Sequence, residues 1–171
     1  GGYIASEFSH IAARAGAQVT ILQRGQRMLT HFDPDLVGWL MDKFAEIGVD
    51  VRLRTTVEAI EKNGAGFVVH TSSEGGGAIF EADLVVHAAG RAPSLDGLDL
   101  DVGGIAVENG RLKLNEHLQS VSNPAVYAAG DAAQKGPPLT PVSSHDAKMV
   151  AANLLEGNRH THDSVSYTHL R

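Results

Sequence analysis

The sequence predicts an α/β protein that combines a parallel sheet with a three-stranded antiparallel meander. Two observations predict this fold class. Over residues 3–53, helical spacing of apolar residues alternates twice with short β-branched runs, which is typical of parallel strands joined by helices. Over residues 56–81, short extended segments are separated only by glycine-containing turns, which is typical of antiparallel strands.

Two helices are expected in the first half of the chain. Apolar residues recur at helical spacing over residues 3–16, with Gly16 as the C-terminal cap. The second helix has Asp33 as its N-cap and Pro34 in its first turn, and it ends at Gly48. Its apolar face is formed by Leu36, Val37, Leu40, Met41, Phe44 and Ile47.

Short apolar runs predict the strands, which cover residues 19–22, 49–53, 56–62, 66–72, 78–81 and 83–88. After Pro93 a looser connection rich in Gly and Asp leads to extended segments at 111–114 and 125–128 and to a helix over about 141–155. This change predicts a domain boundary near Ala92.

Composition excludes several classes of function. The 171 residues are 43% hydrophobic and 20% charged, with a formal net charge of -6. No apolar run approaches the roughly 20 residues of a membrane span, and no run of Lys or Arg offers a nucleic-acid footprint. The chain has no cysteine, and its nine histidines form no metal-binding motif, since His160 and His162 belong to a polar tail. We therefore expect no membrane, nucleic-acid or metal partner.

The opening glycines match the later part of a dinucleotide fingerprint. Gly2 and Ala5 occupy its second and third small positions, followed by a helix and a strand. Such glycines let the backbone approach a pyrophosphate at a helix N-terminus, so the pattern predicts a Rossmann-like sheet. The first glycine and the strand before it are missing, and a glycine-led helix in an unrelated α/β protein has the same pattern.

The residues after the strand at 19–22 bear on the choice of coenzyme. An acidic residue there binds the ribose 2′-hydroxyl of NAD, whereas cations accommodate the 2′-phosphate of NADP. The chain has Gln23 and Arg24, followed by Arg27, which favours NADPH. The alternative is that both arginines are solvated on a loop.

Four segments in order resemble one family. They are residues 2–8 (GYIASEF), Phe32 with Asp33, residues 88–93 (AAGRAP) and residues 126–131 (VYAAGD). Together they resemble the pyridine nucleotide-disulfide oxidoreductases, the family of glutathione reductase, dihydrolipoamide dehydrogenase and mercuric reductase. The resemblance covers about residues 1–159, and an ordered four-part match is more specific than any single part.

The resemblance implies roles on the coenzyme side. It places Gly2, Tyr3, Ile4 and Ala5 at the coenzyme, with the Tyr3 ring covering the nicotinamide pocket until the coenzyme binds. It makes Glu7 the carboxylate that pairs with a lysine near the flavin, and it places Gly90 at the crossing between domains. Without the resemblance, Tyr3 is a packing residue and Glu7 lies on a solvated helix face.

The resemblance also implies FAD contacts. Asp131, after Gly130, would accept a hydrogen bond from the ribitol chain of FAD. Thr140 and Pro141 would begin a helix whose N–H groups and dipole stabilise negative charge on the reduced flavin. From the residues alone, Asp131 is equally a turn residue and Pro141 suits the start of any helix.

We therefore expect an internal fragment of a two-dinucleotide flavoprotein. Residues 1–91 would be a NAD(P)H-binding domain without its first strand, residues 92–159 the second part of a FAD-binding domain, and residues 160–171 a tail that begins a dimerisation domain or is a foreign scar. Loss of the central strand would leave two strands without a neighbour and the isolated fragment inactive.

The parent is expected to be a cytoplasmic homodimeric enzyme that passes hydride from NAD(P)H to FAD and on to a small-molecule or small-protein disulfide. Two alternatives remain open: a flavin reductase that donates to oxygen, quinone or an iron–sulfur protein, and a non-catalytic NAD(P)H-binding module.

Overall fold

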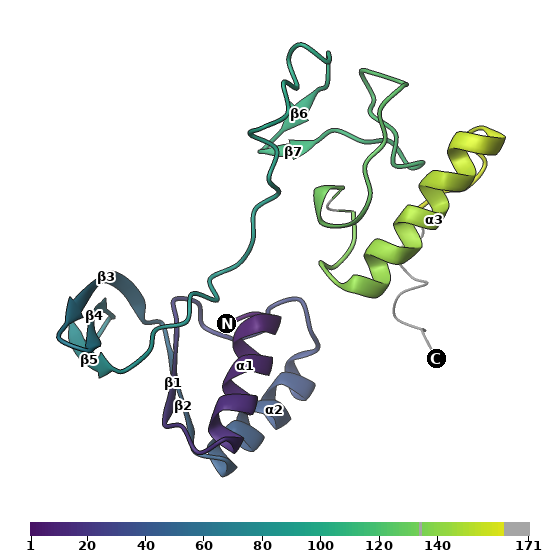
Figure 1. Cartoon of the computed structure of the whole chain (residues 1–171). Helices are drawn as coiled ribbons and strands as arrows, with labels where there is room; N and C mark the ends of the chain where they lie inside the picture. Colours follow the sequence, from purple (N-terminus) through teal and green to yellow (C-terminus); the bar gives the residue numbers. More distant parts are fainter. Residues whose placement is uncertain (134, 163–171) are drawn as a thin grey trace. The chain divides into compact units, whose positions relative to one another are not determined.

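The structure of the protein is a computed structural model that describes residues 1–133 and 135–162. The chain divides into two compact units, Gly1–Arg91 and Ala92–Arg171 (Figure 1). Within the described ranges, no helix has the length and apolar character needed to cross a bilayer.

The first unit contains the predicted parallel sheet. Strand β1 (Val19–Gln23) pairs in parallel with β2 (Val49–Leu53), and the register runs from Val19 opposite Val49 to Gln23 opposite Leu53. The helices α1 (Tyr3–Arg14) and α2 (Pro34–Glu46) connect with these strands in the order α1, β1, α2, β2. The carboxyl ends of β1 and β2 therefore lie side by side.

The limits of α2 follow from residues that the sequence makes plain. The Asp33 carboxylate accepts hydrogen bonds from the N–H groups of Asp35 at 2.9 Å and Leu36 at 3.3 Å, as an N-cap does. Gly48, at φ +79°, follows Ile47 at the other end and reverses the chain into β2. Buried Phe44 fixes the helix to the sheet in a core that also contains Ile21, Met28 and Val49.

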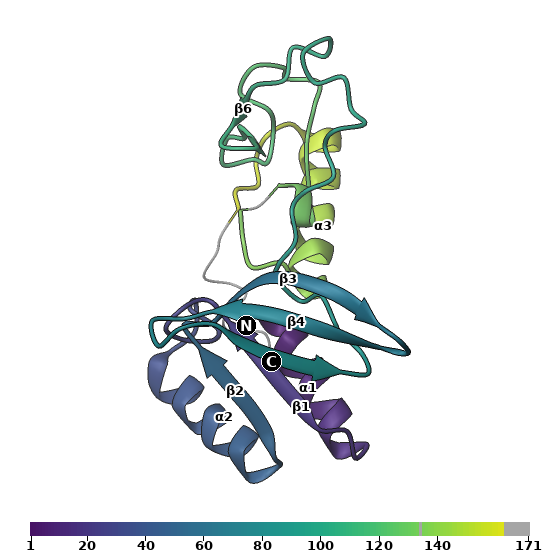
Figure 2. The same cartoon turned by 90° about the vertical axis from the view of Figure 1, so that its left-hand side faces the viewer.

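The predicted meander is also present in the first unit. Strands β3 (Thr56–Asn63), β4 (Gly66–Ser72) and β5 (Ala78–Ala82) pair antiparallel in that order, side by side (Figure 2). The β3–β4 turn requires Gly64 at φ +59°. The α/β fold class, with one parallel and one three-stranded antiparallel sheet, is confirmed.

Two predicted strands are wrong. Residues 83–88 form no strand, because no described segment pairs with them, and a strand exists only where a neighbour receives its hydrogen bonds. Residues 125–128 form only an isolated bridge, between Tyr127 and Gln119. The capping glycine of α1 is as predicted: the helix ends at Arg14, Gly16 adopts φ +93°, and the N–H groups of Gly16 and Ala17 donate to the carbonyls of Ala13 and Ala12, each at 3.0 Å.

In the second unit, segments without regular secondary structure pack against one long helix. Its elements are the short strands β6 (Val107–Glu108) and β7 (Arg111–Leu112), the 3-10 turn η1 (Gly130–Ala132) and helix α3 (Thr140–Glu156). The β6–β7 hairpin turns at Asn109 and Gly110, both at positive φ, an Asn-Gly signal that the sequence contains. Its core consists of Leu114, Leu118, Ala133 and Met149.

Chain beyond α3 also belongs to this unit. The carbonyl of buried Asn153 accepts hydrogen bonds from the N–H groups of Arg159 at 3.2 Å and His160 at 2.9 Å. The N–H of His162 donates to the carbonyl of Glu116 at 2.7 Å, and the His162 side chain is 6% exposed. Residues 160 and 162 are therefore held to the unit by hydrogen bonds, and the His162 side chain is buried, although the expected tail starts at 160. The part of that tail from 163 onward lies outside the described residues.

Candidate functional site

The start of α1 lies against the end of β1. Gly2 precedes the helix in an extended conformation, and no side chain caps the first turn. A Cβ on Gly1 would lie 2.6 Å from Oε1 of Gln23, so the absence of a side chain at Gly1 allows this close approach. The uncapped N–H groups of the first turn are suited to an anion.

The residues that follow Gly2 differ in exposure. Tyr3 and Ala5 are half-buried, whereas Ile4 and Glu7 are exposed. Ser6, which the sequence pattern did not single out, is buried and donates its hydroxyl to the Gly2 carbonyl at 3.1 Å. This bond adds to the backbone bond from Ser6 N–H to the same carbonyl and holds the first turn in place.

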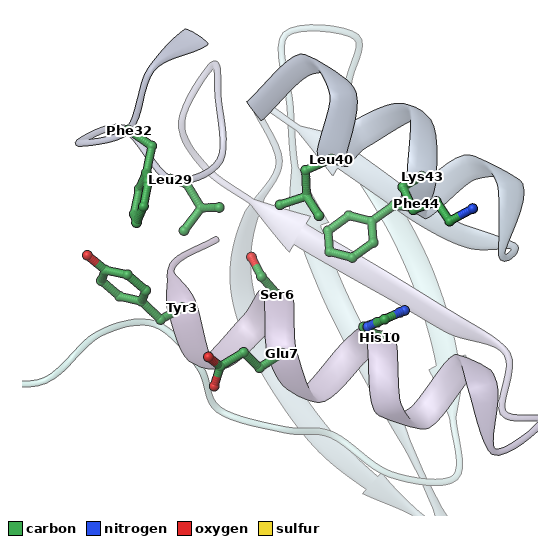
Figure 3. A pocket seen from close by; sticks show the side chains of 9 residues that line it. All are labelled: Tyr3, Ser6, Glu7, His10, Leu29, Phe32, Leu40, Lys43 and Phe44. Atoms are coloured by element: carbon green, nitrogen blue, oxygen red, sulfur yellow. The ribbon is translucent and has the colours of Figure 1, made fainter. Parts of the chain in front are cut away.

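Tyr3 and Glu7 line a common cavity between α1, α2 and the loop before α2 (Figure 3). The Tyr3 ring meets Phe32 edge to face, with centroids 5.3 Å apart and an interplanar angle of 72°. The cavity has a volume of about 290 Å³ and is lined by Tyr3, Ser6, Glu7, His10, Leu29, Phe32, Leu40, Lys43 and Phe44. Tyr3 and Glu7, to which the resemblance assigns roles near the nicotinamide and the flavin, thus line the same cavity.

A second, polar cavity of about 330 Å³ lies beyond the ends of the parallel strands. It is lined by Arg24, Gln26, Arg54, Thr56, Ser72, Ser73 and Glu74. Arg24 follows β1, and Arg54 follows the adjacent end of β2. Arg54 was not predicted as a site residue, although its position after a parallel strand is the signal that would have found it.

The structure places Arg27 differently from Arg24. The Arg27 guanidinium donates to the carbonyl of Thr30 at 2.8 Å and to that of Phe32 at 3.5 Å. Gln23 donates its amide to the Arg27 carbonyl at 3.2 Å. Arg27 therefore holds the loop between β1 and α2 and does not line the polar cavity, whereas Arg24 does.

Gly90 lies at the end of the first unit. It is exposed and has φ +113°, a conformation that residues with side chains rarely adopt, and no neighbour approaches the position of an added Cβ. Backbone conformation, rather than close packing, is the requirement for glycine at this position.

In the second unit, Gly130 and Asp131 form a tight turn against α3. Gly130 has φ +63°, and an added Cβ would lie 2.0 Å from Oγ of Ser143. The Gly130 N–H donates to the Asp146 carboxylate at 3.0 Å, and Asp146 is completely buried. The turn is therefore fixed from α3, with Asp131 exposed beside it.

The start of α3 lies next in the chain. Thr140 and Pro141 are exposed in its first turn, and no side chain caps the helix. An exposed carboxylate and an uncapped helix N-terminus fit a ligand that offers hydroxyl donors and carries developing negative charge. The residues present are thus compatible with part of a flavin site.

A parallel sheet with a glycine-led helix at its carboxyl edge, in a chain that also contains a fixed Gly-Asp turn, is the arrangement typical of dinucleotide-binding proteins of the α/β class. The sequence model of one family, described as pyridine nucleotide-disulphide oxidoreductase, matches residues 1–147. The chain belongs to this family.

Individual relatives agree with this assignment. The chain is 35% identical to a glutathione reductase of Burkholderia cepacia, over 92% of the chain and 34% of that protein. It is 32% identical to a mercuric reductase of Staphylococcus aureus, over 90% of the chain and 28% of that protein. The chain thus spans about a third of the length of these relatives.

Solved structures agree as well. The HOCl-induced flavoprotein disulfide reductase RclA of Escherichia coli is similar with a TM-score of 0.79 and 28% identity, over 96% of this chain and 36% of that one. The fold is therefore shared with a flavoprotein disulfide reductase.

Proposed function

We propose that the chain is part of a FAD-dependent NAD(P)H oxidoreductase that passes hydride from NAD(P)H to FAD and electrons onward to a disulfide-type acceptor. The family match over residues 1–147 supports the flavoprotein assignment, and the glutathione reductase relative supports a small disulfide as substrate. In this proposal residues 1–91 bind the coenzyme and residues 92–159 contribute to the flavin site. Residues 160–171 are the start of a dimerisation domain or a foreign sequence.

The close approach of Gly1 to Gln23 is the observation that carries the coenzyme site. It brings an uncapped helix N-terminus to the carboxyl edge of the sheet, where the first-turn N–H groups at Gly2 to Ala5 would bind a pyrophosphate. Arg24, without a hydrogen-bond or ion-pair partner among residues 1–133 and 135–162, would bind a 2′-phosphate, which favours NADPH over NADH. Arg27 would stabilise the conformation of the loop between β1 and α2.

Tyr3 and Glu7 would serve the nicotinamide end of the coenzyme. In this proposal the Tyr3 ring leaves its edge contact with Phe32 to admit the nicotinamide, and exposed Glu7 supports the flavin side through a lysine. Gly90, at φ +113°, would lie where the chain crosses from the coenzyme-binding domain to the flavin-binding domain.

On the flavin side, Asp131 would accept a hydrogen bond from a ribitol hydroxyl, and Gly130 would keep the turn tight. Thr140 and Pro141 would form the first turn of α3, whose N-terminus would face the flavin ring. A bound flavin supplies the two-electron acceptor, and the residues of this chain orient it and stabilise its negative charge. We further propose that the enzyme is a cytoplasmic homodimer.

The visible spectrum of the protein expressed from its complete reading frame tests the proposal. A flavin spectrum that bleaches on anaerobic addition of NADPH is expected. A colourless protein that still binds NADPH would contradict the flavoenzyme assignment and favour a non-catalytic binding module.

A further inference from the structure

We propose that Arg54 is a second residue that binds the 2′-phosphate of NADPH and that it sets the preference for NADPH together with Arg24. In this proposal the carboxylate of Glu74 lowers the affinity of the site for the phosphate. This inference rests on the proposed coenzyme site and names a residue that the dinucleotide fingerprint does not contain. It starts from the polar cavity of about 330 Å³, which Arg24, Arg54 and Glu74 all line.

The register of the parallel sheet places the two arginines together. Gln23 pairs with Leu53 at the last position of β1 and β2, so Arg24 and Arg54 are the first residues beyond two adjacent strand ends. Ligands of open parallel sheets bind outside these carboxyl ends. The position of Arg54 is thus equivalent to that of Arg24, one strand further along the sheet.

Backbone hydrogen bonds hold Arg54 in this position. Its N–H donates to the carbonyl of Gly25 at 3.0 Å, and the next N–H, of Thr55, donates to the carbonyl of Gln23 at 3.0 Å. Arg54 also adopts φ +51°, a left-handed conformation that is uncommon for a residue with a side chain. The turn after β2 is therefore tied to the loop after β1, which fixes the backbone from which the guanidinium extends.

Charge supports a phosphomonoester as the ligand. A 2′-phosphate carries a charge of about −1.5 to −2 at neutral pH, which two guanidinium groups match better than one. Thr56 lines the same cavity, and its hydroxyl can donate to one of the remaining phosphate oxygens.

Glu74 should lower the affinity of the site for a phosphate group. Its carboxylate lies 3.8 Å from Nη1 of Arg54, with side chains 83% and 57% exposed, respectively. Such a long, solvated ion pair is weak. A phosphate can therefore displace the Glu74 carboxylate from Arg54. The nearby carboxylate still repels the phosphate and lowers the affinity of the site for it.

The test measures equilibrium binding of NADPH and NADH to the full-length protein and to its variants. Arg54→Ala should raise the Kd for NADPH about tenfold and leave the Kd for NADH within about twofold. The reason is that only NADPH has a 2′-phosphate, so only NADPH loses a charge-assisted hydrogen bond when the guanidinium is removed. Glu74→Gln should lower the Kd for NADPH about two- to threefold without affecting NADH. Arg52→Ala is the matched control, since Arg52 lies on β2, pairs with Asp50 at 2.8 Å and is outside the cavity.

The outcomes separate this inference from the proposed function. If the wild type prefers NADPH and Arg24→Ala removes that preference while Arg54→Ala does not, the assignment of Arg54 is wrong and the coenzyme site stands. If Arg54→Ala weakens NADPH and NADH equally, Arg54 supports the loop and the inference is likewise wrong. A wild type that binds both coenzymes alike would overturn the NADPH preference together with this inference.

Discussion

The backbone N–H of Gly130 donates a 3.0 Å hydrogen bond to the carboxylate of Asp146, a side chain that is completely buried on α3. The ring Nε2 of His162, itself 6% exposed, lies 3.8 Å from the same carboxylate. A buried carboxylate thus connects the Gly130–Asp131 turn, the long helix and the chain beyond it. Because buried charge is costly without partners, this group should be important to the second unit.

Replacing Asp146 with Ala should therefore destabilise the protein. The Gly130 N–H would lose its acceptor inside the unit, at a cost of about 1–3 kcal/mol. Asp146→Asn keeps an acceptor of similar size and should cost less. Chemical denaturation measures the loss, and absorbance of the purified protein measures whether flavin content falls with it. Asp42→Ala, on the exposed side of α2, is the control and should change neither quantity.

Gly130→Ala should destabilise the protein by more than the cost of placing alanine in a left-handed backbone conformation. The left-handed backbone costs a non-glycine residue about 1–2 kcal/mol. The clash of the new methyl group with Ser143, 2.0 Å from its Oγ, adds about 1–3 kcal/mol.

Gly104→Ala is a closely matched control. Its φ of +61° is almost that of Gly130, and nothing lies within 4 Å of an added Cβ. Thermal unfolding of both variants separates backbone strain from the clash. Equal losses would show that Ser143 does not restrict the turn, and Ser143→Ala in the Gly130→Ala background should recover part of the difference.

Asn153 should govern the attachment of the chain beyond α3. Its amide donates to the carbonyls of His117 at 3.2 Å and His160 at 2.9 Å, and its carbonyl accepts from the N–H groups of Arg159 and His160. Asn153→Ala should cost about 2–4 kcal/mol, because several hydrogen bonds are lost at one buried site.

Trypsin cleavage after Arg159, followed by mass spectrometry, reports this attachment directly. Cleavage should become faster in Asn153→Ala, whereas Leu154→Ala, at a neighbouring side chain that is 61% exposed, should leave the rate unchanged. Equal cleavage rates in the wild type and Asn153→Ala would mean that other contacts hold residues 157–160.

The sequence predicts those parts of the fold that local chemistry determines. The capping carboxylate of Asp33, the reversal at Gly48 and the three strands from Thr56 to Ala82 depend on caps, turns and alternation, all of which are local. A strand at residues 83–88 was predicted from apolar character alone, but pairing depends on a neighbour that local sequence cannot supply.

The candidate site shows the same division. Gly2 and Arg24 were found because they occupy fixed positions of a linear fingerprint. Arg54 lies thirty residues beyond Arg24, and only the register of β1 against β2 brings both to one cavity. Conversely, Arg27 is close to Arg24 in sequence, but its guanidinium is engaged by the carbonyls of its own loop. Sequence distance was therefore a poor guide to which cations share the cavity.

Gln23→Glu should shift the coenzyme preference from NADPH toward NADH. Gln23 ends β1, where a carboxylate can accept hydrogen bonds from the ribose hydroxyls of NADH and repels a 2′-phosphate. We expect the ratio of the Kd for NADPH to that for NADH to rise by about tenfold or more, since like charges in contact cost more than one hydrogen bond contributes. Gln18→Glu, the same change just before the opposite end of β1, should leave the ratio unaltered. An unchanged ratio in Gln23→Glu would show that the ribose of the coenzyme does not bind at the end of β1, because any nucleotide bound there must lie beside the new charge.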